Sequence, residues 1–193
     1  MSGDRGARAS GDPTGLLLKA VAFAAEKHRY QRRKDADASP YINHPIELAS
    51  LLMEQGITDI VVLCAALLHD TIEDTNTTVD ELQREFGDAT TDVVREVTDD
   101  TALDKADRKR LQIEHARSLS HRARLVKLAD KICNLRDIVA SPPANWPRQR
   151  KEDYFAWAKD VIDGLRGAHR GLEALFDAVY TEGLAAVRKL PQP

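Results

Sequence analysis

The sequence predicts an all-α fold, built as a single compact domain of many helices. Aromatic residues make up only 5% of the chain, while Ala and Leu are frequent, a composition that favours helix. Apolar residues recur at helical spacing along nearly the whole chain, and no segment shows the alternation that predicts a β-strand. The length of 193 residues fits one domain with a substantial core.

Each expected helix is defined by its apolar spacing and by residues that favour a helix terminus. Pro45 suits a first helical turn, and Gly56 is typical of the position just after a helix. Thr78 and Glu81 have the spacing of a capping box. The expected helices cover residues 14–31, 45–56, 58–70, 78–87, 88–97, 104–118, 121–138, 148–169 and 172–190.

The segment 58–70 differs from the others because it is apolar nearly all round, which predicts a buried central helix. It contains the longest apolar run, Ile60 to Leu68, which is far too short to span a bilayer. The formal net charge of −3 provides no basic excess for binding nucleic acid. We therefore expect neither a membrane nor a nucleic-acid partner, and the sequence indicates no particular oligomeric state.

The N-terminal residues 1–14 mix Arg, Asp, Gly and Ser without an apolar stretch. They are expected to form a flexible tail rather than a secretory signal, and residues 15–193 are expected to form the domain. Cys64 and Cys133 lie within apolar helical patterns, which favours buried free thiols over a disulfide. Free thiols indicate a reducing compartment, so cytoplasmic localisation is expected.

The strongest local feature is the tract HDTIED at residues 69–74, which directly follows the most apolar helix. Ionisable groups at the end of a buried helix need partners, and a metal ion is a common one; a solvated helix end is the plainer alternative. Glu73 and Asp74 follow Asp70 at the spacing of one helical turn. If the helix continues, all three carboxylates share one face.

Two further positions carry candidate ligands. His44 lies at the beginning of an expected helix, where it is either a terminal cap or a ligand. Asp130 lies in an otherwise apolar helix, and Asn134 follows one turn later on the same face. A buried carboxylate needs a cation, which is either a metal ion or one of the neighbouring lysines, Lys127 and Lys131.

Together these residues resemble the metal-ligand signature of the HD superfamily. The strings RRK (32–34), PYINHP (40–45), LHDTIED (68–74) and KLADKICNL (127–135) are similar to the hydrolase domain of RelA/SpoT proteins, as are residues 97–100 and 154–158. The resemblance covers most of the chain and is greatest toward short stand-alone alarmone hydrolases of the metazoan SpoT-homologue type. One difference is the loop 35–39, which lacks the glycine that many bacterial members have there.

The resemblance implies one divalent metal ion, Mn²⁺, held by His44, His69, Asp70 and Asp130. Imidazole and carboxylate donors without thiolate suit Mn²⁺, although zinc accepts them too. Such an ion activates water and neutralises phosphate charge. The resemblance also makes Glu73 and Asp74 the catalytic carboxylates that position or deprotonate the attacking water. The matched substrate-binding residues are Arg33, Lys34, Lys105, Asn134, Arg150 and Tyr154.

Among these, Arg33 is expected to stack on the guanine base and Lys34 to reach a phosphate. Asn134 is expected to contact the ribose, and Lys105 to contact a phosphate from a loop. Other residues are given structural roles. These are surface positions for His28, His115, His121 and His169, and packing roles for Trp146 and Trp157.

The predicted reaction is Mn²⁺-dependent removal of the 3′-diphosphate from ppGpp or pppGpp, which gives GDP or GTP and pyrophosphate. An alternative is the same chemistry on another nucleotide with a phosphorylated ribose, such as NADPH, and comparing the two rates separates these. A second alternative is a non-catalytic module that binds a nucleotide and signals to a partner. Tight binding of ppGpp without turnover would indicate that module.

Overall fold

The computed structural model describes residues 12–190. This range contains α-helices, one short 3-10 helix and an isolated β-bridge between Arg32 and Pro40, which confirms the all-α prediction. Within it, no helix has the length and apolar character needed to cross a membrane. The helices are α1 (Pro13–Lys27), α2 (Asn43–Glu54), α3 (Ile60–Leu68), α4 (Thr71–Asp74), α5 (Val79–Val97), α6 (Lys105–His115), α7 (His121–Ala140), α8 (Arg148–Leu165) and α9 (Arg170–Arg188), with the 3-10 helix at Ala116–Ser118.

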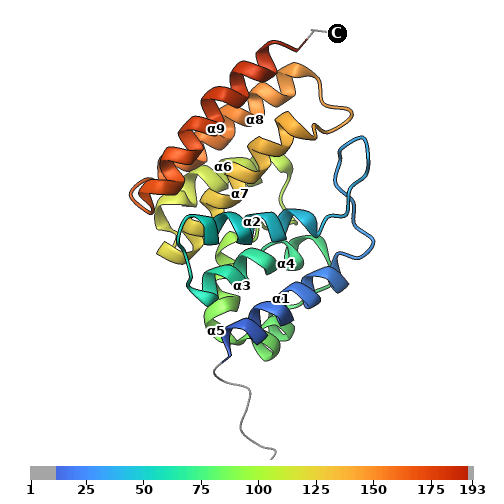
Figure 1. Ribbon diagram of the computed structural model, residues 1–193, viewed down its shortest axis with the longest axis vertical. Coiled ribbons are helices and arrows are strands. Elements are labelled where there is room, and N and C mark those ends of the chain that lie inside the picture. The colour runs from blue at the N-terminus through green and yellow to red at the C-terminus, as the bar shows by residue number, and fades with distance from the viewer. Residues whose placement is uncertain (1–11, 191–193) are drawn as a thin grey trace, which may run out of the picture.

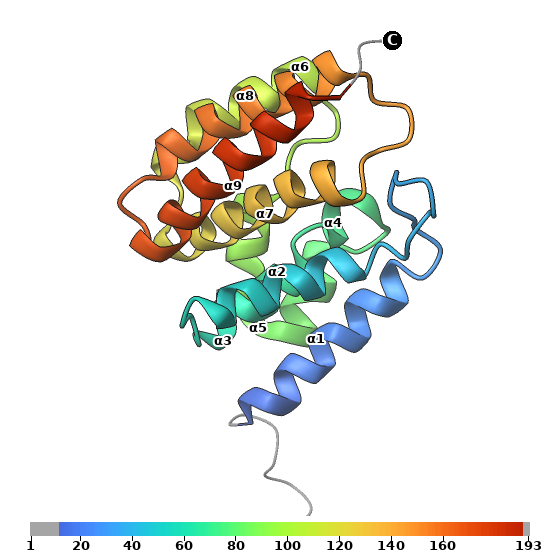
Figure 2. The same cartoon turned by 45° about the horizontal axis from the view of Figure 1, so that its top comes forward.

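Helix α7 occupies the middle of the molecule. Helices α1, α2, α3 and α5 lie on one side of it, and α6, α8 and α9 lie on the other (Figures 1 and 2). It packs against α9, α2, α3, α5 and α8, and a run of its residues from Leu125 to Cys133 is buried. A polar side chain on α7 is therefore placed at the centre of the fold, which is where Asp130 lies.

Helix α3 is the buried helix that the apolar run predicted. Its residues from Val62 to Leu68 are all buried, and the Asp59 side chain caps its first turn by accepting from Val61 N at 3.0 Å. The helix ends at Leu68, and α4 begins at Thr71 as a separate single turn. The helix therefore does not continue through the tract 69–74, so the condition under which Asp70, Glu73 and Asp74 would share one helix face is not met.

Most other helix boundaries lie close to their expected positions, with physical reasons for the differences. Gly87 has a φ of 77°, which separates the two halves of α5 at the point where two helices were expected. The first helix ends at Lys27 rather than at residue 31, since His28 leaves helical geometry as its C-cap. Lys105 is the first residue of α6 and not part of a loop, because the Asp104 side chain caps this helix. The expected tail, residues 1–14, lies outside the described range except for Asp12, which caps α1, and Pro13 and Thr14, which belong to it.

Two loops lie side by side at one edge of the molecule, the loop between α1 and α2 and the loop between α7 and α8 (Figures 1 and 2). Ala144 N donates to Lys34 O at 2.9 Å, which joins the two loops directly. Arg33 forms an ion pair with Asp137 at the end of α7. Ala38 adopts a φ of 49°, the left-handed region that favours glycine, within the loop that lacks one.

Candidate metal centre and active site

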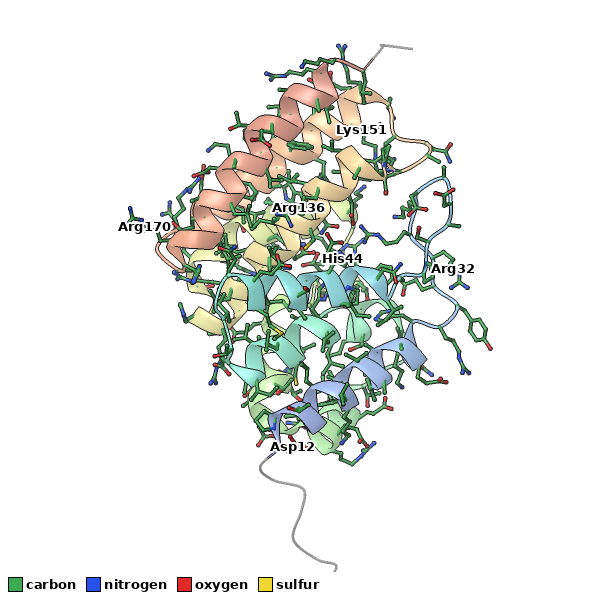
Figure 3. All side chains as sticks on the ribbon, viewed as in Figure 1. Asp12, Arg32, His44, Arg136, Lys151 and Arg170 are labelled. Carbon is green, nitrogen blue, oxygen red and sulfur yellow. The ribbon has the colours of Figure 1, made fainter. Side chains whose placement is uncertain are left out.

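Three of the four predicted metal ligands form one buried cluster. Their ligand atoms, from His44, His69 and Asp130, all lie within 4.8 Å of one another. His44 Nε2 is 3.3 Å from Asp130 Oδ1, and His69 Nε2 is 3.9 Å from the same oxygen. His44 stands at the start of α2 in the interior of the molecule, as Figure 3 shows. Three elements far apart in sequence thus converge on one point.

The surroundings of His69 leave one ring nitrogen available for a cation. Its Nδ1 is 2.9 Å from the carbonyl oxygen of Ala66, and a carbonyl only accepts, so Nδ1 carries the proton. Its Nε2 is buried and has no hydrogen-bond partner among the described residues. A buried imidazole lone pair beside two carboxylates fits a divalent metal ion, and the donor set of nitrogen and oxygen agrees.

Asp70 adjoins this cluster and also contacts Tyr41, which lies just before α2. Its Oδ2 is 3.0 Å from His69 Nε2 and accepts a hydrogen bond from the Tyr41 hydroxyl. Because Tyr41 fixes one oxygen of the carboxylate, Asp70 is oriented before any ion binds. Asp70 remains a predicted fourth ligand.

The charges in the cluster depend strongly on one another. Burial alone would raise the pKa of Asp130, but the Lys131 ammonium and the two histidines hold it well below its usual range. Burial likewise opposes the charged form of His69, yet the carboxylates of Asp70 and Asp130 raise its pKa to about 9. In the absence of an ion, protons on nitrogen balance the carboxylates that a metal would otherwise neutralise.

Glu73 and Asp74, the predicted catalytic carboxylates, face different partners. Glu73 Oε1 is 3.1 Å from Arg108 Nη1, and Glu73 Oε2 accepts from Asp99 N at 3.2 Å. Burial, followed by the carboxylates of Asp99 and Asp70, raises the pKa of Glu73. Asp74 is exposed, and its Oδ2 accepts from Gln31 Nε2 at 2.7 Å. The two carboxylates therefore differ in partners and exposure and are not interchangeable.

A cavity of about 840 Å³ adjoins the cluster and continues into a smaller chamber of about 200 Å³ that contains it. Seven residues line both spaces, including His44 and Asn134. Asn134 Nδ2 donates to Asp130 Oδ1 at 2.6 Å, so this amide spans the junction. All the predicted substrate-binding residues line the larger cavity, namely Arg33, Lys34, Lys105, Asn134, Arg150 and Tyr154.

The rim of this cavity carries cations that lack acidic partners. Within residues 12–190, no carboxylate lies within 4.0 Å of the side-chain nitrogens of Lys34, Lys105 or Arg150. Partial burial, then Arg150 and Lys34, lowers the pKa of Lys105. Cations that repel one another around a cavity favour a polyanionic ligand.

Several cavity residues lie outside the predicted set. Arg108 and Lys109 come from α6, and Lys109 Nζ lies 4.7 Å from the centre of the Trp157 ring. Trp157 and Trp146 pack on the core as expected, but both also line the cavity, and the Arg150 guanidinium lies 4.4 Å from the Trp146 ring centre. The helical spacing of Lys105, Arg108 and Lys109 was a signal that could have placed these cations on one face.

His28 was expected at the surface and is instead buried, with 2% of its surface exposed. Its ring packs on Tyr41 with 4.9 Å between ring centres. The spacing of Ala20, Ala24 and His28, all buried, shows that the inward face of α1 extends one residue beyond the helix. His115 and His121 are exposed as expected, while His169 is partly buried because it caps α9 through Nδ1.

Comparison with known proteins gives consistent matches. A family model described as HD domain matches residues 20–159. The guanosine-3′,5′-bis(diphosphate) 3′-pyrophosphohydrolases MESH1 of Xenopus tropicalis and Homo sapiens are 53% and 56% identical to this chain, over 89% of its length and 97% of theirs. A solved structure of a metazoan SpoT orthologue, described as hydrolysing ppGpp, superimposes with a TM-score of 0.86 at 46% identity, covering 91% of this chain and 99% of that one.

Proposed function

The chain belongs to the HD domain family and, within it, to the group of the MESH1 pyrophosphohydrolases, and we propose that it hydrolyses the 3′-diphosphate of ppGpp and pppGpp. The observation that carries the proposal is a buried cluster of histidines and carboxylates beside a cavity whose rim is cationic. A guanosine with two diphosphate groups carries several negative charges, which complement the positive charge of that rim. With its phosphates bound at the rim, the nucleotide would place the phosphorus that is attacked next to the cluster.

The residues that would hold the metal ion are His44, His69, Asp70 and Asp130. When bound, a divalent ion supplies positive charge for the phosphate oxygens and acidifies water at neutral pH. Nitrogen and oxygen donors without thiolate support Mn²⁺ as that ion. A reducing cytoplasm remains the compartment predicted from the free thiols, and both cysteines are buried.

The chain's own carboxylates would guide the attacking water. Asp74 borders the cavity and would accept the water proton, while Glu73, held by Arg108 and Asp99 N, would orient the water. The water oxygen forms a bond to the phosphorus attached to the ribose O3′. The bond between that phosphorus and O3′ breaks, and the proton from water ends on O3′ of GDP as pyrophosphate leaves.

The cationic side chains would hold the substrate. Lys34, Lys105 and Arg150 would bind phosphates as charged donors, and Arg150 is already braced by the Trp146 ring. Arg33 would pack on the purine, since Asp137 and Tyr41 fix its guanidinium at the cavity wall. Asn134 would contact the ribose next to the cluster.

The test is to incubate the purified protein with ppGpp and Mn²⁺ and to resolve the nucleotides by anion-exchange chromatography. We expect GDP and pyrophosphate, and we expect EDTA, Asp70→Ala or Glu73→Ala to abolish them. A parallel reaction with NADPH compares the alternative nucleotide. Survival of ppGpp in a protein that has bound manganese would overturn the substrate assignment, and tight binding without turnover would indicate a signalling module.

A further inference from the structure

A hydrogen-bonded chain links the buried His28 to the exposed Asp74. His28 Nδ1 is 2.6 Å from Gln31 Oε1, and Gln31 Nε2 donates to Asp74 Oδ2 at 2.7 Å. A carboxylate only accepts, so the amide nitrogen of Gln31 must face Asp74 and its carbonyl oxygen must face His28. Nδ1 of His28 is then the donor. Each of the three side chains therefore has a single consistent role as hydrogen-bond donor or acceptor in each contact.

The backbone around Gln31 is fixed at both ends. Gln31 N donates to His28 O at 2.9 Å, and Tyr41 N donates to Gln31 O at 3.2 Å. His28 itself is held by its own backbone N, which donates to Ala24 O at 2.9 Å. The segment that carries the amide is thus anchored to α1 on one side and to the start of α2 on the other. A side chain on such a segment is preorganised.

Asp74 has no comparable support of its own. It is the last residue of α4, a helix of four residues, and its side chain is exposed. No lysine, arginine or histidine nitrogen in residues 12–190 lies within 4.0 Å of its carboxylate, whereas Glu73 is paired with Arg108. Gln31 therefore supplies the one side-chain hydrogen bond found for Asp74 in this range.

We infer that Gln31 and His28 are positioning residues, which hold the Asp74 carboxylate in the orientation needed to accept a proton from water. The inference rests on the proposed function for the identity of the reaction. A neutral amide donor fixes one oxygen of Asp74 without neutralising its negative charge. The other oxygen, Oδ1, remains free to accept, as a general base requires. An arginine or lysine at this position would hold the carboxylate but oppose its basicity.

The key variant is Gln31→Met, which keeps the length of the side chain and removes its donor and acceptor. We expect kcat to fall about tenfold or more while KM and manganese binding stay close to wild type, because an oriented base acts in the chemical step. His28→Leu should reduce kcat in the same direction. His28→Asn should recover part of it, since the asparagine amide can donate near the position of Nδ1.

A matched control is available on α5. Gln83 Nε2 donates to Asp88 Oδ1 at 3.3 Å, an exposed glutamine–aspartate pair whose residues line neither cavity. Gln83→Met should leave kcat, KM and stability unchanged. A loss in Gln31→Met that also occurred in Gln83→Met would count against a specific positioning role.

A double-mutant cycle separates positioning from general structural damage. In an Asp74→Asn background, Gln31→Met should cause little further loss of kcat, because the carboxylate that it positions is already gone. Losses that multiply instead would mean that Gln31 acts independently of Asp74, which overturns the inference. Full activity of Gln31→Met would overturn it as well.

The side-chain amide of Gln31 provides a readout that needs no turnover. In the full chain, we expect its NMR resonances to shift in Asp74→Asn and in His28→Leu, and to be unaffected by Gln83→Met. Resonances that do not respond to either change would contradict the hydrogen-bonded chain. A wild-type protein that leaves ppGpp intact would instead count against the proposed function, so the two failures are distinguishable.

Discussion

The ammonium nitrogen of Lys131 lies 2.9 Å from Oδ2 of Asp130, the carboxylate whose Oδ1 faces both His44 and His69. Both partners of this pair are buried. The two oxygens of Asp130 thus have different partners, a lysine on one side and the candidate metal cluster on the other. The sequence left open whether a lysine or a metal ion compensates Asp130, and the geometry accommodates both at once.

Lys131→Met should therefore destabilise the metal-free protein by about 3–5 kcal/mol, because it leaves Asp130 as a buried charge with one partner fewer. With Mn²⁺ present the loss should be smaller, since the ion takes over part of the compensation. Guanidinium unfolding with EDTA or with Mn²⁺ measures both values.

The control is Lys159→Met on α8, which breaks an ion pair with Asp163 in which both side chains are more than 40% exposed. A pair of this kind should contribute no more than about 1 kcal/mol. Similar small losses in the two variants would show that the Lys131–Asp130 pair does not compensate a buried charge.

Glu73→Gln should change the pH dependence of stability of the metal-free protein. Burial, then Asp99 and Asp70, raises the pKa of Glu73 above its ordinary value of 4.5 in the folded state. The stability that this group contributes is therefore present in acid and is lost as the pH rises through the folded-state pKa. Going from acid to neutral pH, the stability of wild type relative to Glu73→Gln should fall.

Thermal unfolding of both proteins at a series of pH values between 4 and 8, in EDTA, provides the measurement. Asp74→Asn is a useful comparison because Asp74 is the adjacent proposed catalytic carboxylate but, unlike Glu73, is exposed. If the relative stability of wild type rose toward neutral pH, the proposed effect of burial on Glu73 would be wrong in sign.

The cationic rim gives a prediction about substrate binding. Lys105→Gln and Arg150→Gln should each raise the KM for ppGpp by about tenfold to a hundredfold, with a smaller effect on kcat, because a charged hydrogen bond to phosphate contributes roughly 1.5–3 kcal/mol. The effect should weaken at high salt, where charge is screened. Steady-state kinetics at two ionic strengths tests both parts.

Arg110→Gln is the matched control on the same helix as Lys105. Arg110 is exposed, pairs with Asp107 and Glu114 within α6, and does not line the cavity. Its substitution should leave the KM unchanged. An equal rise in KM in this variant would mean that the net charge of the protein, and not the rim, determines the effect.

Much of the fold followed from local sequence signals. The apolar run at residues 60–68 predicted the buried α3, and the separation of α5 into two halves followed from Gly87. The same reasoning left open whether the helix continues beyond α3, and the polar tract 69–74 in fact leaves the helix and starts a new turn. Glu73 and Asp74 face different partners, Arg108 and Gln31, and these tertiary contacts cannot be read from helical spacing.

The candidate site was predictable where a motif carried it and unpredictable where packing did. His44, His69 and Asp130 were identified from motif resemblance and are found together. His28 is buried because its ring packs on Tyr41, which is distant from it in sequence. No local sequence signal indicated this contact, and the adjacent charged residue Arg29 favoured a surface position. Trp157 was interpreted as packing alone because a sequence does not reveal which edge of a large side chain faces a cavity.

The loop that lacks the glycine of many bacterial relatives gives the last prediction. Ala38 has a φ of 49°, so its Cβ is held in the left-handed region at a cost of about 1–2 kcal/mol. Ala38→Gly removes that strain, and the greater freedom of glycine in the unfolded chain offsets roughly 0.4–1 kcal/mol of the gain. The net result should be a stabilisation of about 0.5–1 kcal/mol, measured by urea unfolding.

Ala36→Gly in the same loop is the matched control, because the backbone at Ala36 does not have a positive φ. It should only add freedom to the unfolded chain and so destabilise the protein by a few tenths to about 1 kcal/mol. Opposite signs for the two variants would establish that the strain is local to Ala38. Equal losses would mean that Ala38 is not strained in solution. Since Arg33 and Lys34 directly precede this loop, the KM of Ala38→Gly for the substrate then reports whether the loop shape also sets their positions at the cavity.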